Sequence, residues 1–515
     1  MPISRRQFLA ASAAVAAARL APAQARSPLA DDPRRPQFHL LPARNWMNDP
    51  NGPIYWQGQY HMFFQYNPHA AVWGDMHWYH AVSPDMIHWR HRPVAIAPTP
   101  GWADSEGVFS GTAIVHQGKV AMLYTGVQNA PPENSSIRDG QHNFHESQLL
   151  AWADDASLNS FTKVMKPVIP NPPEGMTVTG FRDPSPWRAG DRFYMTVGSG
   201  IEKQGGCVLL YSSPDLVHWK YEHILAQGLG DSAQTPNPVD SGDMWECPEF
   251  FPLDGKHVLL YSSLSRVQWQ VGTLDEKAMV FHPETHGTFD AGPFYASKSQ
   301  LDKDGNRILW GWIEETRPEA EFSASGWAGC MSLPRVLSVG PDNRLHCRFL
   351  PALAKLRDTR VLPSGHGKGC GVGSCTDGTG SGVGCLSGVC EVVEEACGEI
   401  LYRAAGKSFK LTAKRDGDIE VIGVEWDEKT PSELKVDGKV YSLGTDAKES
   451  PDFHFFVDGS VLEMIAGGRL AMTKRFYWQG AKAPDLDFAA LAQAGSKQTM
   501  EKWQITPISK DRLTT

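Results

Sequence analysis

Long uninterrupted apolar runs are missing from this 515-residue sequence. No stretch approaches the ~18 uncharged apolar residues that a membrane-spanning helix requires, which argues against a membrane protein of that kind. An excess of basic residues is also missing, because 49 Lys and Arg face 58 Asp and Glu and the formal net charge is −9. Phosphate contacts need clustered Lys and Arg, so the charge balance argues against nucleic acid and favours a neutral partner.

The composition is that of a globular protein with many turns. Hydrophobic residues make up 41% of the chain and include 17 Trp and 22 Phe, so large cores can form. The 49 Gly and 37 Pro favour short strands joined by turns over long helices. The chain length predicts two or three domains.

The first 25 residues have the layout of an export signal. Paired arginines within Ser4–Ala10 are followed by an alanine-rich apolar run at Phe8–Ala18 and an A-x-A site at Ala23–Ala25. The segment resembles a twin-arginine signal, although that pattern usually has Lys where Ala10 stands. We expect residues 1–25 to be removed and the mature protein to be periplasmic or secreted.

Cysteine is sparse outside one cluster. Five of the nine cysteines lie within Cys370–Cys397, which overlaps a glycine-rich segment at Gly365–Gly388. Such a segment cannot pack a core, so we expect an insertion braced by disulfides, with one cysteine left over. A metal knot is the alternative, although the two C-x4-C pairs depart from the usual zinc-knuckle spacing.

Short apolar or alternating runs between Phe38 and Val339 predict an all-β domain. SPDMIHW at Ser83–Trp89 recurs as SPDLVHW at Ser213–Trp219, 130 residues later, which indicates a radial repeat. Two blades of about 65 residues within this offset predict five blades, and three of about 43 predict seven. The spacing alone leaves both open.

The chain after Val339 predicts a short connecting helix at Pro351–Arg357 and then a second β domain. Alternating residues on both sides of the Gly467–Gly468 turn are typical of a long hairpin. We therefore place the domains at 1–25 for the signal, 36–345 for the larger β domain, 346–360 for the linker helix and 361–510 for the second β domain, with the Cys- and Gly-rich insertion at 365–397.

Three acidic residues lie in dense motifs beside proline: Asp49 in WMNDPNG, Asp183 in FRDP and Glu246 in WECP. A residue that directly precedes proline is pushed toward extended backbone, so we expect Asp49 and Asp183 at strand ends or turns. Aromatic rings close to these acids in the sequence suit a sugar site, because rings pack on C–H surfaces while carboxylates bind hydroxyls. These are Trp46, Trp187 and Trp245.

Together the motifs resemble glycoside hydrolase family 32, the invertases, levanases and inulinases. The resemblance runs from about Pro36 to Ile505 apart from the cysteine-rich insertion, and the C-terminal segment Asp458–Gly468 is similar to the second domain of that family. The motifs that carry it, in order, are WMNDPNG (Trp46–Gly52), FFQYNP (Phe63–Pro68), Trp73–Gly74, FSGT (Phe109–Thr112), FRDP (Phe181–Pro184), WECP (Trp245–Pro248) and LWGW (Leu309–Trp312).

The resemblance implies an all-β fold, a five-bladed β-propeller followed by a C-terminal β-sandwich, with the active site in the central funnel of the propeller. It also implies that Asp49 is the nucleophile, Glu246 the general acid/base and Asp183 the stabiliser of the transition state. We expect Arg182 to keep Asp183 ionised, because an adjacent cation favours the carboxylate. The implied substrate-binding residues are Trp46, Asn48, Gln65, Trp73, Phe109, Ser110, Arg182 and Trp310.

The expected activity is that of a retaining hydrolase that releases fructose from sucrose, levan or inulin, with no cofactor and no metal. The partner is a small or polymeric fructoside, with neither nucleic acid nor membrane. A fructosyltransferase on the same scaffold and a non-catalytic fructan-binding protein remain as alternatives. Tyr79 stands where the family commonly has Gly, so we expect it to reshape the funnel mouth and affect chain-length preference.

Two further features have a plain interpretation beside a catalytic one. The cluster His142, Phe144, His145 and Glu146 could suggest a metal, but no partner motif at zinc spacing follows it and Pro131–Asn143 is typical of a loop. Cys247 could be a nucleophile, but no nearby His-based activation motif accompanies it, so we expect a buried thiol.

Overall fold

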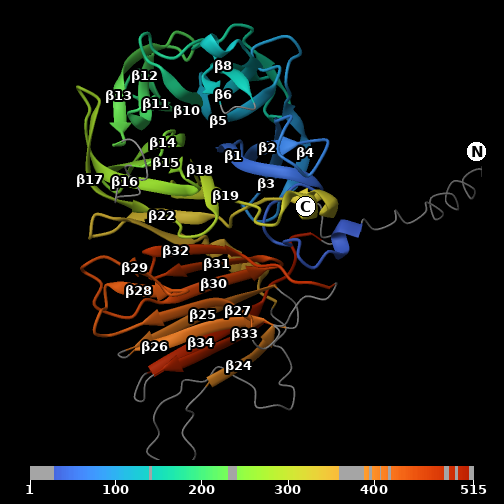
Figure 1. Ribbon diagram of the computed structural model, residues 1–515, viewed down its shortest axis with the longest axis vertical. Coiled ribbons are helices and arrows are strands. Elements are labelled where there is room, and N and C mark those ends of the chain that lie inside the picture. Colours follow the sequence, from blue (N-terminus) through green and yellow to red (C-terminus); the bar gives the residue numbers. More distant parts are fainter. Residues whose placement is uncertain are drawn as a thin grey trace, which may run out of the picture.

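The computed structural model describes residues 28–138, 142–229, 241–358, 388–393, 397–405, 408–415, 419–480, 486–492 and 497–509. Within them, five sheets form a propeller and two more form a sandwich next to it (Figure 1). The predicted export signal and most of the predicted cysteine-rich insertion lie outside the described residues. The described end of the insertion is not a loop, because Gly388–Val393 form a strand of the sandwich and Cys397 begins another, so the expectation was wrong there. In the part of the chain that is described, no helix is long and apolar enough to cross a membrane.

The five blades follow one another along the chain, and each begins with its innermost strand. Blade 1 contains β1 (Asn45–Trp56), β2 (Gln59–Asn67), β3 (His77–Ser83) and β4 (Arg90–Ile96); blade 2 contains β5 (Gly107–His116), β6 (Lys119–Asn129), β8 (Asn143–Ala153), β7 (Ile137–Arg138) and β9 (Phe161–Lys163); blade 3 contains β10 (Val178–Ala189), β11 (Arg192–Ile201), β12 (Gly205–Ser213) and β13 (Lys220–Gln227).

Blades 4 and 5 complete the ring. Blade 4 contains β14 (Glu246–Leu253), β15 (Lys256–Ser263), β16 (Arg266–Asp275) and β17 (Val280–Thr288), and blade 5 contains β18 (Phe294–Leu301), β19 (Arg307–Ile313), β22 (Arg335–Val339) and β23 (Leu345–Phe349), with β21 (Cys330–Met331) beside β19. The short strand β20 (Trp327–Ala328) follows β19 in the chain and pairs in parallel with β1. This pairing joins the last blade to the first.

The sequence repeat is explained by the blade count. Both copies connect the third strand of a blade to the fourth, between β3 and β4 in blade 1 and between β12 and β13 in blade 3. In each copy the aspartate carboxylate accepts backbone N–H groups from the turn, Asp85 from Ile87 and Asp215 from Val217. The offset therefore covers two blade periods, and of the two options that the spacing left open the five-bladed one is correct.

The sandwich consists of two antiparallel sheets around one apolar core. Its sheets are β24 (Gly388–Val393), β33 (Leu486–Ala492), β26 (Phe409–Arg415), β27 (Ile419–Trp426), β28 (Glu433–Val436) and β29 (Lys439–Ser442) on one side, and β32 (Leu470–Arg475), β31 (Val461–Ala466), β30 (Phe453–Asp458), β25 (Cys397–Ala405) and β34 (Lys497–Gln504) on the other. The predicted hairpin is β31–β32, which turns at Gly467 and Gly468 with φ of 55° and 72°. β30 pairs with β31 as well, so the segment is a three-stranded meander.

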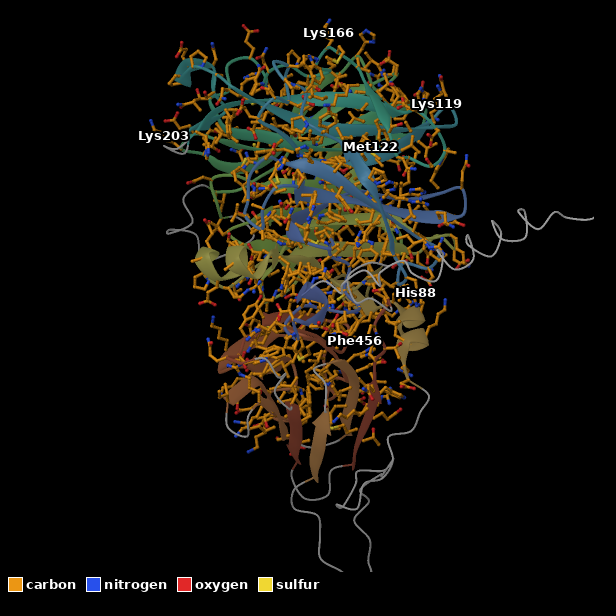
Figure 2. All side chains as sticks on the ribbon, turned by 90° about the vertical axis from the view of Figure 1, so that its right-hand side faces the viewer. His88, Lys119, Met122, Lys166, Lys203 and Phe456 are labelled. Atoms are coloured by element: carbon orange, nitrogen blue, oxygen red, sulfur yellow. The ribbon has the colours of Figure 1, made fainter. Side chains whose placement is uncertain are left out.

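Helices are few and short in the described residues. They are the 3-10 helices η1 (Pro28–Asp31), η2 (Pro132–Asn134) and η4 (Pro351–Leu356) and the α-helix α2 (Glu319–Ser325). The helix η4 lies where the sequence predicts a connecting helix, between the last propeller strand and the first sandwich strand. Its Leu353 and Leu356 are buried in an apolar cluster that also contains Phe456 of the sandwich, labelled in Figure 2.

A buried charge network joins the propeller to the sandwich. His39 contacts Asp458 through Nδ1 at 2.7 Å and Glu463 through Nε2 at 2.8 Å. Arg335 bridges the same Glu463 to Asp290, at 2.5 Å and 2.7 Å. All of these side chains are 0% exposed. Since an unpaired buried charge is costly, the two domains are held in one arrangement in which every charge has a partner.

The network predicts a loss of stability at alkaline pH. Burial lowers the pKa of His39, but its hydrogen bonds to Asp458 and Glu463 outweigh burial and raise the pKa from 6.5 to about 8. A raised histidine pKa stabilises the fold fully below pH 6.5, and this contribution is lost as the pH rises through about 8. Its size is about 2 kcal/mol at 1.36 kcal/mol per pKa unit.

Denaturant unfolding of the wild type on both sides of this pH window should show the loss, and His39→Gln should be less stable at low pH and lack this pH dependence. His88→Gln is the matched control, because His88 lies on the surface beside Asp85 with its side chain 48% exposed. A wild-type free energy of unfolding that does not fall across the window would contradict the assignment.

Candidate active site

The site forms where the five innermost strands meet. β1, β5, β10, β14 and β18 contact one another around the centre of the propeller, and each contains a β-bulge. A bulge bends its strand and redirects a side chain. The residues in these five bulges include Asp49, Ser110, Asp183, Cys247 and Ala296, respectively.

Asp49 is held by donors from three strands. Ser110 donates its hydroxyl to Oδ2 at 2.6 Å, and the Asn48 side-chain amide donates to Oδ1 at 3.0 Å. The indole N–H of Trp46 in turn fixes Asn48 at 2.8 Å, and the Cys247 thiol lies 3.6 Å from Oδ2. Burial raises the pKa of Asp49, the hydrogen bond from Ser110 opposes it, and the charge of Glu246 raises it further.

Asp183 is almost fully enclosed, at 3% exposed. Its Oδ2 accepts the backbone N–H of Cys247 at 2.8 Å, and the Cys247 thiol lies 3.5 Å from the same oxygen. One thiol therefore contacts both Asp49 and Asp183. Burial is the main cause that raises the pKa of Asp183 to about 7; Arg182 lowers it and Glu246 and Asp49 raise it.

The backbone at these acids differs from the expectation. Asp183 has a φ of 65°, in the left-handed region, although it precedes Pro184, and it lies inside β10. Asp49 lies inside β1. The prediction of extended backbone was therefore wrong for Asp183. The prediction of a strand end or turn was wrong for both acids, because each lies inside a strand. The bulges overcome the local preference, because neighbouring strands fix the chain on both sides.

Glu246 accepts hydrogen bonds from two side chains, one at each carboxyl oxygen. Arg182 donates to Oε1 from Nε at 3.0 Å and from Nη2 at 2.8 Å, and the Tyr295 hydroxyl donates to Oε2 at 2.5 Å. The third arm of Arg182, Nη1, donates to Glu146 at 2.9 Å. The carboxyl group of Glu246 is thus fixed in orientation while its side chain stays 29% exposed.

The expected role of Arg182 needs correction. Its guanidinium forms its hydrogen bonds with Glu246 and Glu146, and its charge alone acts on Asp183. That charge lowers the pKa of Asp183 but does not overcome burial, so Arg182 by itself does not keep Asp183 ionised. The adjacency of Arg182 and Asp183 in FRDP suggested a pair, but within the described residues the side-chain N–H groups of Arg182 bond to the two glutamates.

The structure connects four of the eight expected binding residues to the acids: Trp46, Asn48, Ser110 and Arg182. Trp46 donates to Asn48, and Asn48 donates to Asp49. Gln65 is 2% exposed and donates to the Val108 carbonyl at 2.9 Å, and its Oε1 has no hydrogen-bond partner among the described residues. Trp73 is 49% exposed and packs edge-on against Phe109, with ring centroids 6.1 Å apart.

Trp310 and Tyr79 lie elsewhere. Trp310 is 1% exposed and packs against Trp89 in the apolar core between blades 1 and 5, so its assignment to the substrate surface was wrong. Trp312, two residues later, packs against Trp46 instead. Tyr79 packs on Phe64 and Tyr66 within blade 1, and this packing does not support a role at the funnel mouth.

Four charged or polar residues near the acids were not assigned from the sequence: Glu146, Tyr295, Lys298 and Glu314. Glu146 stood in a cluster considered for metal, yet its carboxylate accepts Ser136, the Phe181 backbone and Arg182. Glu314 lies in the loop after β19, and burial, with the charges of Asp49 and Glu246, raises its pKa to about 7 although Arg266 opposes the shift. Their positions depend on contacts between blades, which no local motif shows.

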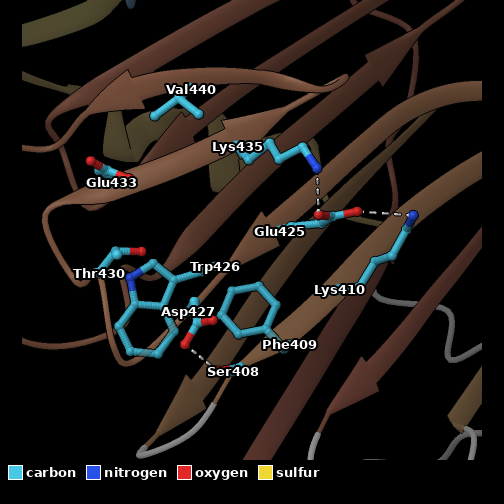
Figure 3. Close-up of a pocket in the computed structure, with 10 residues that line it drawn as sticks. All are labelled: Ser408, Phe409, Lys410, Glu425, Trp426, Asp427, Thr430, Glu433, Lys435 and Val440. Atoms are coloured by element: carbon cyan, nitrogen blue, oxygen red, sulfur yellow. Dashed lines mark hydrogen bonds and ion pairs between the residues drawn. The ribbon is translucent and has the colours of Figure 1, made fainter.

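Other clusters in the described part of the chain offer less chemistry. A depression of about 570 Å³ on the sandwich is lined by residues such as Trp426 and Val440 (Figure 3). Its charged members are Glu425, Asp427, Glu433, Lys410 and Lys435. Each lysine lies 3.1 Å from Glu425 in a solvent-exposed ion pair. Among the described residues, no group of three or more His, Cys, Asp or Glu is placed to hold a metal ion.

The thiol between the two aspartates is expected to be unreactive in the folded protein. Cys247 is 1% exposed, which confirms the predicted buried thiol, and burial with the charges of Asp183 and Asp49 raises its pKa well above the usual value. The same holds for the other buried cysteines, with pKa values of about 12: Cys207, Cys330 and Cys347.

Peptide mapping after treatment with iodoacetamide should therefore find all four thiols unmodified in the native protein and alkylated after unfolding. Thiolates are the reactive form, so rapid native alkylation at Cys247 would show an activated nucleophile and reject the buried-thiol assignment.

Comparisons with known proteins identify the family of the chain. The family model "Glycosyl hydrolases family 32 N-terminal domain" matches residues 39–348, and a twin-arginine translocation signal matches residues 2–18, which indicates export. The sequence is 38% identical over 320 residues to a sucrose-6-phosphate hydrolase of Escherichia coli, which covers 59% of this chain and 62% of that protein. It is 36% identical over 337 residues to an acid β-fructofuranosidase of Vicia faba, over 59% of this chain and 49% of that protein.

Solved structures extend the likeness to the second domain. A family 32 β-fructofuranosidase of Bombyx mori matches with a TM-score of 0.74 at 26% identity, over 98% of this chain and 99% of that chain. Fructan 1-exohydrolase IIa of Cichorium intybus matches with a TM-score of 0.71 at 26% identity, over 92% and 98%. The matches to the curated relatives above span less than two thirds of their length, whereas the family model covers more than half of this chain. The chain belongs to glycosyl hydrolase family 32.

Proposed function

We propose that the protein is a retaining β-fructosidase that hydrolyses β-fructosides through a fructosyl-enzyme intermediate. The observation that carries the proposal is the pair of differently held carboxyl groups. Asp49 is held by the hydroxyl of Ser110 and the amide of Asn48, whereas Glu246 is held by Arg182 and Tyr295 and remains open to solvent. Two carboxyl groups in unlike surroundings are what glycoside hydrolysis requires.

The first chemical step uses the two groups together. The Asp49 carboxylate attacks the anomeric carbon of the fructosyl unit, the glycosidic C–O bond breaks, and Glu246 donates its proton to the leaving oxygen. In the second step Glu246 takes a proton from water, the water oxygen attacks the same carbon, and the bond to Asp49 breaks. Two inversions leave the β configuration of fructose unchanged.

Asp183 acts as the stabiliser in this proposal. Its carboxylate is fixed by the backbone N–H of Cys247, and its own N–H donates to Thr125 at 2.9 Å, so its oxygens keep one direction. A fixed, buried carboxylate stabilises the positive charge that develops on the sugar ring and binds ring hydroxyls. In this proposal the three carboxyl groups and water carry out both steps, and neither step uses a metal or a cofactor.

Sucrose and unphosphorylated fructans are the proposed substrates. A variant of the Bombyx mori enzyme has been solved with sucrose and a variant of the Cichorium intybus enzyme with 1-kestose. The export signal supports substrates found outside the cytoplasm, in the periplasm or the medium. We propose that the propeller is the catalytic unit and that the cysteine-rich insertion, which ends in the sandwich strand β24, is braced by disulfides and has no catalytic role.

A substrate panel tests the activity. Sucrose, inulin, levan and sucrose 6-phosphate are incubated separately and the products resolved by chromatography. Free fructose from one or more unphosphorylated sugars is the expected result. Fructose oligomers at high sucrose would show a transferase, and binding without products would show a fructan-binding protein.

Substitutions of the two acids should have different effects. Asp49→Asn should abolish turnover of every substrate, because the nucleophile is lost. Glu246→Gln should impair sucrose most and a fructoside with an activated leaving group least, because such a leaving group needs no protonation. Equal loss on both substrates in steady-state assays would reject Glu246 as the acid.

Stereochemistry gives an independent check of Asp49. Proton NMR during the first minutes of sucrose hydrolysis should show β-fructose before mutarotation, because a double displacement retains configuration. First-formed α-fructose would make Asp49 a base that activates water and would reject the nucleophile assignment while leaving the substrate class intact.

A further inference from the structure

Lys298 is a buried cation next to the acids that the mechanism above does not use. It lies on β18 and is 0% exposed. Its ammonium donates to the Pro248 carbonyl at 3.5 Å, and it forms no ion pair within 4.0 Å among the described residues. A lysine is rarely buried without such a pair, because desolvation of the ammonium is costly.

Lys298 reaches the strained bulge that carries Glu246. Cys247 has a φ of 49° directly before Pro248, a left-handed conformation that is unfavourable for a residue with a side chain and more so before proline. Strain of this kind persists only when the surroundings hold it. The Pro248 carbonyl is held from two strands, by Lys298 of β18 and by the Thr196 hydroxyl of β11 at 3.4 Å.

The strand β18 thus contacts the acid/base segment at two points. Tyr295 holds the Glu246 carboxyl group, and Lys298, three residues later, holds the backbone two residues beyond Glu246. The bulge in β18 lies between these two residues, so both side chains depend on the same irregularity of the strand.

The charge of Lys298 acts on the same groups. It lowers the pKa of Asp183 on β10 and of Cys247 and Glu249 on β14. The other charged groups that face Asp183 are Arg182 of its own strand, Glu246 of β14 and Asp49 of β1. Arg182 is engaged by two glutamates, whereas Lys298 has a neutral carbonyl as its hydrogen-bond partner in the described part of the chain.

We propose that Lys298 is a positioning residue whose ammonium fixes the Glu246–Pro248 bulge and whose charge adds to that of Arg182 in favouring an ionised Asp183. The proposal rests on the proposed function, because it concerns the reactive state of the same three acids. Lys298 touches neither the substrate nor the reacting atoms in this role.

The test compares Lys298→Met with Lys298→Arg in pH profiles of kcat/KM for the sugar that the wild type hydrolyses. Loss of the cation should move the acidic limb of the Lys298→Met profile to higher pH by about one unit, since a neighbouring cation stabilises the carboxylate. Its kcat should fall by about tenfold or more while KM changes little. Lys298→Arg keeps the charge and should retain the wild-type acidic limb.

Lys435→Met is the matched control. This substitution also removes a positive charge. Lys435 lies on the sandwich, where its side chain is half exposed and paired with Glu425 (Figure 3), so the pH profile of Lys435→Met should match that of the wild type. Equal losses in Lys298→Met and Lys298→Arg with an unmoved acidic limb would overturn the proposal and leave a packing role.

Lys298→Gln keeps the test decisive if Lys298→Met does not fold, as judged by circular dichroism. A glutamine side chain keeps polar N–H groups at the buried position but carries no charge, so the acidic limb should again move to higher pH, and an unmoved limb would overturn the proposal. A wild type that hydrolyses no fructoside would instead overturn the proposed function and this role with it.

Discussion

The burial of several carboxyl groups where five strands meet is the constraint on which the rest of the site depends. Asp183 is 3% exposed and lies close to Asp49 and Glu246, so each negative charge makes the next more costly. The donors and cations that offset this cost come from every blade: Asn48, Ser110, Arg182, Cys247 and Tyr295 with Lys298. The site is therefore complete only when β20 pairs with β1 and the ring is closed.

Backbone irregularity is the means by which the strands supply these groups. A regular strand alternates its side chains between two faces, so successive residues could not both point into the site. Asp183 and Cys247 adopt positive φ values of 65° and 49° directly before proline, which costs about 1–3 kcal/mol at each position. The packing of the blades offsets this cost. Asp183 and Cys247 can therefore keep a left-handed backbone that is unfavourable before proline.

The family resemblance that the motifs carry was sufficient to predict the fold and the three acids as neighbours. The motifs of the three acids lie on the innermost strands of three blades, and those strands converge. The motifs were insufficient for contacts between blades. Arg182 precedes Asp183 in FRDP but bonds to Glu246 of the next blade, and Tyr295 belongs to no assigned motif. In LWGW, Trp310 and Trp312 are two residues apart and share one face of β19, so the choice between them depends on how far along the strand the site lies, which the residues of the motif do not encode.

The chain contains two charge networks that differ in their exposure to solvent, one at the domain interface and one at the centre of the propeller. At the domain interface His39 and Arg335 are paired with acids that are all 0% exposed, so the network is sealed from solvent. At the propeller centre Glu246 stays 29% exposed and the acids outnumber the cations: Asp49, Asp183, Glu246, Glu146 and Glu249 face Arg182 and Lys298. The carboxylates of this open site accept hydrogen bonds from hydroxyl groups, as the proposed fructoside substrate requires, whereas those of the sealed interface are already used by His39 and Arg335.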